Sequence, residues 1–185
     1  MARSVSKDYL QNFRFTVTVI DGCGAAEDIS EASSAGFHTC TTPEGTLATV
    51  NYREGQYQWT RQQPGIASMS TVTLTRGVAR TDGTFFNWWM NCAGGTSGAG
   101  GRASNLGIGY RATIAISHFD RNFLTEDRGP QDPRKLTPAL VYILFQAFPV
   151  KHKPASNLDA TSGEVSLAEL DLSYEYYNIS APERA

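Results

Sequence analysis

Alternation of apolar and polar residues is the dominant pattern along this chain. Residues 13–20, FRFTVTVI, carry an apolar side chain at every second position, with Arg or Thr between them. A period of two is typical of a strand that buries one face. The same period recurs in residues 69–78, and further strands are predicted over 47–52 and 110–119.

Two later segments depart from simple alternation. Residues 139–150, ALVYILFQAFPV, are apolar on both faces, so this strand is expected in the middle of the fold. Residues 163–177 predict the last strand, but its apolar residues change parity along the way. A bulge or sharp bend is therefore expected near Ala168-Glu169.

One helix is predicted in the middle of the chain. Phe85, Trp88, Trp89 and Cys92 recur at i, i+3, i+4 and i+7. Such an aromatic stripe can form a stacking platform for bases or sugars. Beside strands, it more often covers the apolar face of a sheet. We therefore interpret Phe85, Trp88 and Trp89 as a plug over the sheet.

Turn-forming residues are expected to separate these elements. Asp21-Gly22 predicts a turn after the first strand, and Pro64-Gly65 predicts a break before the third. Asp82 or Thr84 can cap the start of the helix, and Gly94-Gly95 is expected to end it.

Two segments are expected to be surface loops in a single domain that spans residues 1–185. Residues 93–109 are rich in glycine, whereas 120–138 contain three prolines among charged residues. The glycines do not match a phosphate-binding P-loop, because Gly100-Gly101 leads into Arg-Ala instead of Lys-Ser/Thr. A surface loop is the better interpretation.

Composition and charge exclude several classes of protein. The 185 residues are 41% hydrophobic and 18% charged, which is ordinary for a globular protein. The net charge is −2 and no basic block is present, which disfavours tight binding to nucleic acid. No apolar run reaches the length of a membrane span, and the first residues lack the apolar core of a secretion signal. We expect a soluble protein made in the cytoplasm.

Candidate catalytic and metal-binding residues do not form a recognisable motif. Three cysteines, Cys23, Cys40 and Cys92, are far apart and odd in number, so free thiols are expected. Three histidines, His38, His118 and His152, lack metal-ligand spacing. Four carboxylates could supply a catalytic pair but resemble the solvated face of a strand: Glu164, Glu169, Asp171 and Glu175. We expect no metal, no cofactor and no enzymatic activity.

Four blocks in sequence order carry a family resemblance. They are Asn51–Gly55; the stretch from Pro64-Gly65 through Val72–Gly77 to Trp88-Trp89; Phe145–Lys151; and Gly163–Leu172. Together they resemble the tail tube proteins of contractile phages and phage-tail-like contractile injection systems. The third block is similar to the family's aromatic-Asn-Ala-Trp-Pro-Val-Lys. This chain departs from the family pattern at Gln63, where Leu is usual, and at Phe148, where Trp is usual.

The resemblance implies a fold and an assembly. Members look like two packed antiparallel sheets with a flanking helix, and six copies form a ring with one continuous inner β-barrel. Rings stack into a hollow tube, and closure of the barrel removes exposed strand edges. Implied partners are further copies of the chain, a sheath protein, baseplate or spike proteins and tube-cap proteins. Effector proteins or DNA would pass through the lumen without specific binding, and the subunit itself would not insert into a membrane.

The resemblance also implies where subunits meet. The loop between the early strands, residues 52–65, is expected to extend along the tube to the neighbouring ring. Candidate residues for the subunit and ring interfaces are Tyr52, Arg53, Glu54, Arg61, Arg76, Glu164, Glu169 and Asp171. The resemblance covers a core over about 13–177, against which 93–109 and 120–138 look like insertions that are expected to face outward. Assembly is expected in the cytoplasm of a bacterium, or of a phage-infected host, as part of an injection particle or virion.

The sequence leaves other interpretations open. The subunit could belong to a phage virion instead of an injection system, or it could be a tube initiator at the baseplate that forms one ring. A different class is a monomeric β-sandwich that holds a ligand through Trp88, Trp89 and Tyr110. An enzyme would need a substrate whose turnover depends on Glu169 or His118.

Overall fold

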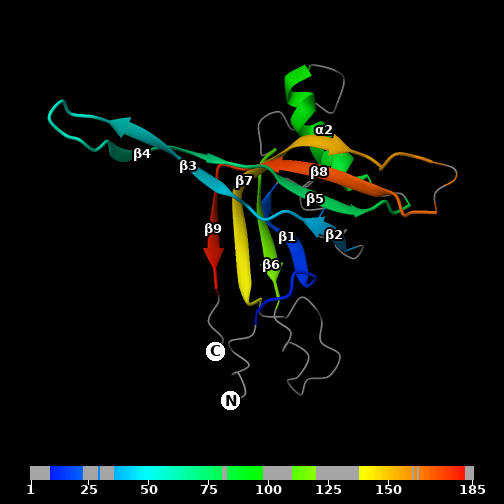
Figure 1. The fold of residues 1–185 in the computed structure, drawn as a ribbon. Helices are drawn as coiled ribbons and strands as arrows, with labels where there is room; N and C mark the ends of the chain where they lie inside the picture. Colours follow the sequence, from blue (N-terminus) through cyan, green and yellow to red (C-terminus); the bar gives the residue numbers. More distant parts are fainter. Residues whose placement is uncertain are drawn as a thin grey trace, which may run out of the picture.

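Antiparallel strands and one flanking helix make up the part of the chain that this computed structural model describes: residues 9–22, 29, 36–80, 83–97, 110–119, 138–159, 161 and 163–181 (Figure 1). The strands are β1 (Phe15–Gly22), β2 (Phe37–Cys40), β3 (Gly45–Tyr52), β4 (Arg61–Met69), β5 (Val72–Gly77), β6 (Ala112–His118), β7 (Leu140–Lys153), β8 (Leu167–Ser173) and β9 (Tyr176–Ser180). The helix is α2 (Thr84–Ser97).

Strand β7 is the centre of the main sheet. This seven-stranded sheet has the order β1-β6-β7-β8-β5-β2, and β9 also pairs with β7. β3 and β4 form a separate two-stranded sheet. All of these pairs are antiparallel. The predictions of a mainly antiparallel β fold and of a central strand at 139–150 are confirmed. The expectation of two packed antiparallel sheets needs correction: the described residues form one seven-stranded sheet, whose two halves β7 joins, and the two-stranded β3–β4 sheet.

A bend in β7 divides the main sheet into two halves. Val141–Phe145 pair with β9, whereas Phe148–Lys153 pair with β8. Gln146 lies between these two segments. Its backbone φ is 55°, in the left-handed region that residues other than Gly, Asn and Asp rarely adopt. Figure 1 shows the result: β1, β6 and β9 run across the direction of β5 and β8. The fold is therefore barrel-like although it is built on one sheet.

The core lies between these two halves and under α2. Its largest fully buried side chains are Val17, Ile29, Val72, Leu74, Trp88, Ile114, Leu144, Leu170 and Leu172. Burial alternates residue by residue along β5, as the sequence pattern predicts, and it alternates along β8 as well. The core thus draws on both halves of the sheet, and the bend in β7 brings those halves face to face.

The first strand begins and ends later than the sequence pattern predicts. Phe13 is exposed and precedes β1. The strand also continues through Asp21-Gly22, where the sequence predicts a turn, with an irregularity after Val19. A Cβ atom at Gly22 would lie 2.9 Å from the Cβ of Ala112. Gly22 therefore allows close approach to β6 and does not mark a turn.

Pro64-Gly65 lies inside β4 and does not break it, contrary to expectation. The register shifts at this point, because Thr49 pairs with Pro64 whereas Leu47 pairs with Ala67. Proline is tolerated at such a bulge, since it has no N–H to donate to the ladder. A Cβ atom at Gly65 would lie 3.0 Å from the Ala48 carbonyl oxygen. Pro64 therefore lies at a bulge in the hairpin, and Gly65 allows the two strands to approach closely there.

Helix α2 passes through Gly94-Gly95 and ends at Ser97. Glycine in a helix costs only about 1 kcal/mol relative to alanine, which is not enough by itself to end one. The helix starts at Thr84, and the Asn87 N–H donates to the Gly83 carbonyl oxygen at 2.8 Å. Asp82, the other predicted cap, lies outside the described residues, as do 98–109 and 120–137 of the predicted insertions.

The last strand is interrupted later than predicted. Burial alternates without a change of face through β8, and Val165, which suggested the change, is exposed before the strand begins. The break falls at Tyr174-Glu175, where the chain leaves the second half of β7 for the first. There the Glu175 N–H donates to the Phe145 carbonyl oxygen at 3.1 Å, and the Glu175 carboxylate pairs with Arg111.

Replacing Gln146 by glycine is expected to raise the free energy of unfolding by about 0.5–1 kcal/mol, because glycine adopts a positive φ without the Cβ clash. Little packing is lost, since the Gln146 side chain is exposed. Asparagine, the residue in the family's block, is expected to give a smaller gain, and valine a loss. Urea denaturation of the three variants measures this order. A valine variant as stable as the glycine variant would contradict it.

Candidate assembly surfaces

The β3–β4 hairpin carries exposed apolar side chains out into solvent. Figure 1 shows it projecting from the main sheet, with its tip far from the core. Every residue of β3 is exposed. The exposed apolar residues of the hairpin are Leu47, Val50, Tyr52, Tyr57, Trp59 and Ile66, with Trp59 at 77% and Ile66 at 83%. An apolar surface of this kind is typical of a contact with another protein.

Four of the predicted interface residues meet at the hairpin tip. Tyr52 pairs with Arg61 across the hairpin, and the Arg61 guanidinium lies 4.7 Å from the centre of the Tyr57 ring. Arg53 and Glu54 are exposed in the connecting turn, where the Tyr57 N–H donates to the Glu54 carbonyl oxygen at 3.0 Å. Aromatic and basic side chains therefore gather at the tip.

Two other predicted residues lie on the face of β8 turned away from the core. Asp171 accepts a hydrogen bond from the Thr73 hydroxyl at 2.7 Å and lies 3.3 Å from the Lys151 ammonium. Glu169 is paired in register with Thr75 on β5 and with Lys153 on β7. The carboxylates on this face thus have cations and hydroxyls as neighbours within the subunit.

Glu164 and Arg76 occupy different environments. Glu164 is exposed in the segment before β8. Arg76 is 3% exposed, and its guanidinium lies over the Phe85 ring, 4.0 Å from the ring centre, and donates to the Thr84 hydroxyl. Arg76 therefore joins β5 to the start of α2, and surface contact with another subunit does not fit it. Its parity with Val72 and Leu74 is the sequence signal for burial.

The aromatic residues of α2 differ in exposure. Trp88 and Phe85 are buried against the sheet, and the Trp88 Nε1–H donates to the Tyr110 carbonyl oxygen at 2.9 Å. Trp89 is half-buried beside His152, with 6.3 Å between ring centres. Burial lowers the pKa of His152 below its ordinary value, which favours the neutral imidazole.

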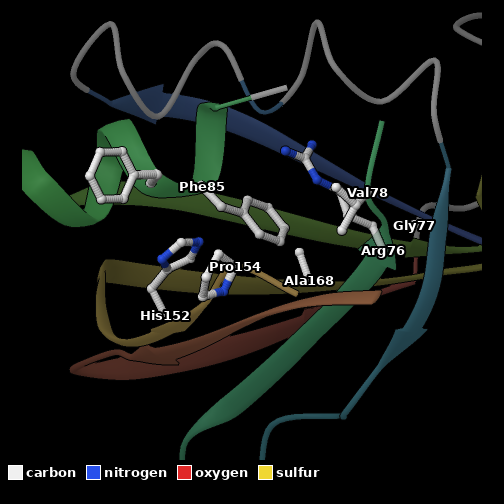
Figure 2. A pocket seen from close by; sticks show the side chains of 8 residues that line it. Arg76, Gly77, Val78, Phe85, His152, Pro154 and Ala168 are labelled. Atoms are coloured by element: carbon white, nitrogen blue, oxygen red, sulfur yellow. The ribbon is translucent and has the colours of Figure 1, made fainter. Parts of the chain in front are cut away.

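A pocket lies between α2 and the ends of β5, β7 and β8 (Figure 2). Its lining residues are Arg76, Gly77, Val78, Phe85, Phe86, His152, Pro154 and Ala168. Its volume is about 60 Å³, whereas sites for small molecules have roughly 300–1,000 Å³. Trp88 is fully buried, so it is not available to hold a ligand at the surface. These features do not favour a ligand-binding module.

Reactive groups are sparse in the described part of the chain. Burial raises the pKa of the Cys40 thiol to about 12, so it stays protonated at neutral pH. No group of three or more His, Cys, Asp or Glu side chains that could hold a metal ion occurs among the described residues. Over the same residues, no helix is long and apolar enough to cross a membrane.

The fold is mainly β, and its exposed hairpin offers an apolar surface for contact with another protein. The family described as T4-like virus tail tube protein gp19 matches residues 11–178. The chain belongs to this family, which confirms the prediction of a structural, non-enzymatic tail tube subunit. No curated protein has a significantly similar sequence.

Chains in two solved tube assemblies share the fold. A chain in the PVC sheath–tube complex of an extracellular contractile injection system, in its extended state, is 20% identical with a TM-score of 0.66, covering 98% of this chain and 100% of that one. A chain in the anti-feeding prophage cap, described as a tube-terminating cap, is 19% identical with a TM-score of 0.65, covering 95% and 93%.

Proposed function

We propose that this protein is the repeating subunit of the inner tube of a contractile injection system. Six copies form a ring, and rings stack inside a sheath to make a conduit for effector proteins or DNA. The observation that carries the proposal is the β3–β4 hairpin, whose exposed apolar residues suit burial against another subunit. Family membership supplies the class of assembly.

Open strand edges support ring formation. Among the described residues, β1, β2 and β9 each pair with one strand and lie at an edge of the main sheet. Edge strands invite pairing with another chain, and a closed ring uses that tendency while leaving no edge exposed. Pairing between neighbouring copies would extend the sheet into a continuous barrel around the lumen. The predicted insertions at 93–109 and 120–138 would then face outward.

The choice of an injection system over a phage virion rests on the solved structures. The PVC chain comes from an extracellular contractile injection system, and its match covers nearly the whole of this chain, as does the match to the anti-feeding prophage chain. Their names include a sheath and a terminating cap, which are the partners that we propose for this subunit. A tail tube in a phage virion is the alternative, with DNA as cargo.

The similarity to a chain in a tube-terminating cap favours a second candidate, a specialised subunit that forms one ring at an end of the tube. The two roles differ in whether rings of this protein stack on one another.

Purified protein is expected to elute with a mass six times that of the 20.2 kDa chain and to form rings and short tubes in negative stain. Light scattering behind size exclusion measures the mass. Rings that never stack at high concentration would favour the terminal subunit. A stable monomer over the whole concentration range would overturn the proposal.

A further inference from the structure

We propose that the hairpin tip, residues 52–61, docks on the β7–β8 connection, residues 154–166, of a second copy in the adjacent ring. This inference rests on the proposed function and names the partner surface for the hairpin. Three observations support it. The two segments lie at opposite ends of the molecule, their side chains are complementary, and hydrogen bonds already hold the receiving segment in place.

The two segments lie at opposite ends of the molecule. Figure 1 shows the tip at one end and the connection between β7 and β8 at the other, with β5 and β8 running between them. An open, repeating stack requires a head-to-tail contact between two different surfaces, because a self-complementary contact closes as a dimer. Segments at opposite ends can make that contact without distorting the subunit.

The tip offers aromatic and basic groups. Tyr52, Tyr57 and Trp59 are each at least half exposed. The segment contains two arginines, Arg53 and Arg61, and one glutamate, so its net charge is positive. Arginine and aromatic residues are enriched at the energetically important centres of protein interfaces.

The connection offers the complementary groups. Leu158 is 87% exposed and Val165 is 74% exposed, which is high for aliphatic side chains. The only charged residues in 154–166 are Asp159 and Glu164, so the segment carries two carboxylates and no cation. Apolar side chains can pack against the aromatic rings of the tip while the carboxylates face its arginines.

Hydrogen bonds within the subunit hold parts of this connection in a defined conformation. The Asp159 carboxylate accepts from the Thr161 N–H at 2.9 Å and from the Thr161 hydroxyl at 2.7 Å. The Ser156 hydroxyl lies 3.3 Å from the Ser166 hydroxyl and accepts from the Leu167 N–H at 3.4 Å. The Ser156 contacts tie both ends of the segment together, which lowers the entropy lost on docking.

The acidic residues on the open face of β8 fit this role less well. Glu169 and Asp171 are half-buried in the middle of the sheet, and Asp171 already contacts Lys151 and Thr73. Asp159 and Glu164 are both exposed, so they are the carboxylates best placed to receive the tip.

Charge reversal on each side, followed by mixing, tests the pairing. The tip variant Arg53→Glu/Arg61→Glu and the connection variant Asp159→Lys/Glu164→Lys are each expected to form rings but at least roughly tenfold less pelletable tube than wild type, because like charges face each other. Rings of the two variants, mixed, are expected to form tubes again, since every contact then joins opposite charges. The control Arg53→Lys/Arg61→Lys keeps the charge and is expected to keep the tubes.

The outcomes separate this pairing from the proposed function. If the wild-type protein forms tubes and the charge-reversed variants do so equally well, the pairing is wrong but the tube function stands. The same holds if the mixture of the two variants stays as rings. Wild-type protein that forms neither rings nor tubes would overturn both. Tubes restored only in the mixture would support both.

Discussion

Replacing Trp88 by alanine is expected to lower the free energy of unfolding by about 3–5 kcal/mol, a large effect for a single substitution. The indole is fully buried between α2 and the sheet, so its removal leaves a cavity. The Tyr110 carbonyl oxygen also loses the Nε1–H that it accepts at 2.9 Å. Domains are stable by only about 5–15 kcal/mol, so much of the variant is expected to be unfolded or insoluble.

Urea denaturation followed by circular dichroism measures this loss, and soluble yield reports it if the variant does not fold. Phe86→Ala is the matched control, because Phe86 is an aromatic residue of the same helix but is half exposed. It is expected to cost at most about 1 kcal/mol. Equal losses for the two variants would contradict the role of α2 as a cover whose Trp88 fills the core.

Removing the outer part of the hairpin is expected to abolish tubes while leaving the subunit folded. Residues 48–66 can be replaced by Asn-Gly, a two-residue turn suited to a hairpin. Leu47 and Ala67, which would flank the new turn, are already paired across the hairpin, as are Thr46 and Ser68. The removed segment lies outside the core, so the free energy of unfolding is expected to change little.

Negative-stain microscopy and size exclusion are expected to find rings without stacks for this variant. The wild-type protein at the same concentration is the control. Tubes of normal length from the shortened protein would exclude the hairpin as the contact between rings. Loss of rings as well as tubes would place the hairpin in the contact within the ring.

Sequence patterns predict well which faces of the strands are buried. Thr and apolar residues alternate along β5, and the structure buries Val72 and Leu74 as that pattern predicts. The central position of β7 also follows from its apolar residues on both faces. These features are local, because side-chain direction in a strand has a fixed period of two.

Features that depend on distant partners do not follow from the sequence pattern. Gly22 and Gly65 predict turns, yet each allows close approach to a neighbouring strand. The interruption between β8 and β9 falls where the partner changes along β7, which a single strand's sequence does not reveal. The charge of Arg76 favours the surface, although its position in the alternation matches the core.

The candidate interface is predictable in part. Tyr52, Arg53, Glu54 and Arg61 do lie together at the tip of an exposed hairpin, as a loop between early strands suggests. The segment that we propose as its partner, residues 154–166, has no such sequence signal, because the sequence does not reveal that Leu158 and Val165 are exposed.

The most direct test of the tube subunit is a cryo-electron microscopy reconstruction of the assembled protein. We expect six copies per ring, strands joined across subunits into one barrel around an open lumen, and each hairpin reaching the next ring. A reconstruction in which the sheets of neighbouring copies do not join, or in which no lumen is enclosed, would contradict the assignment.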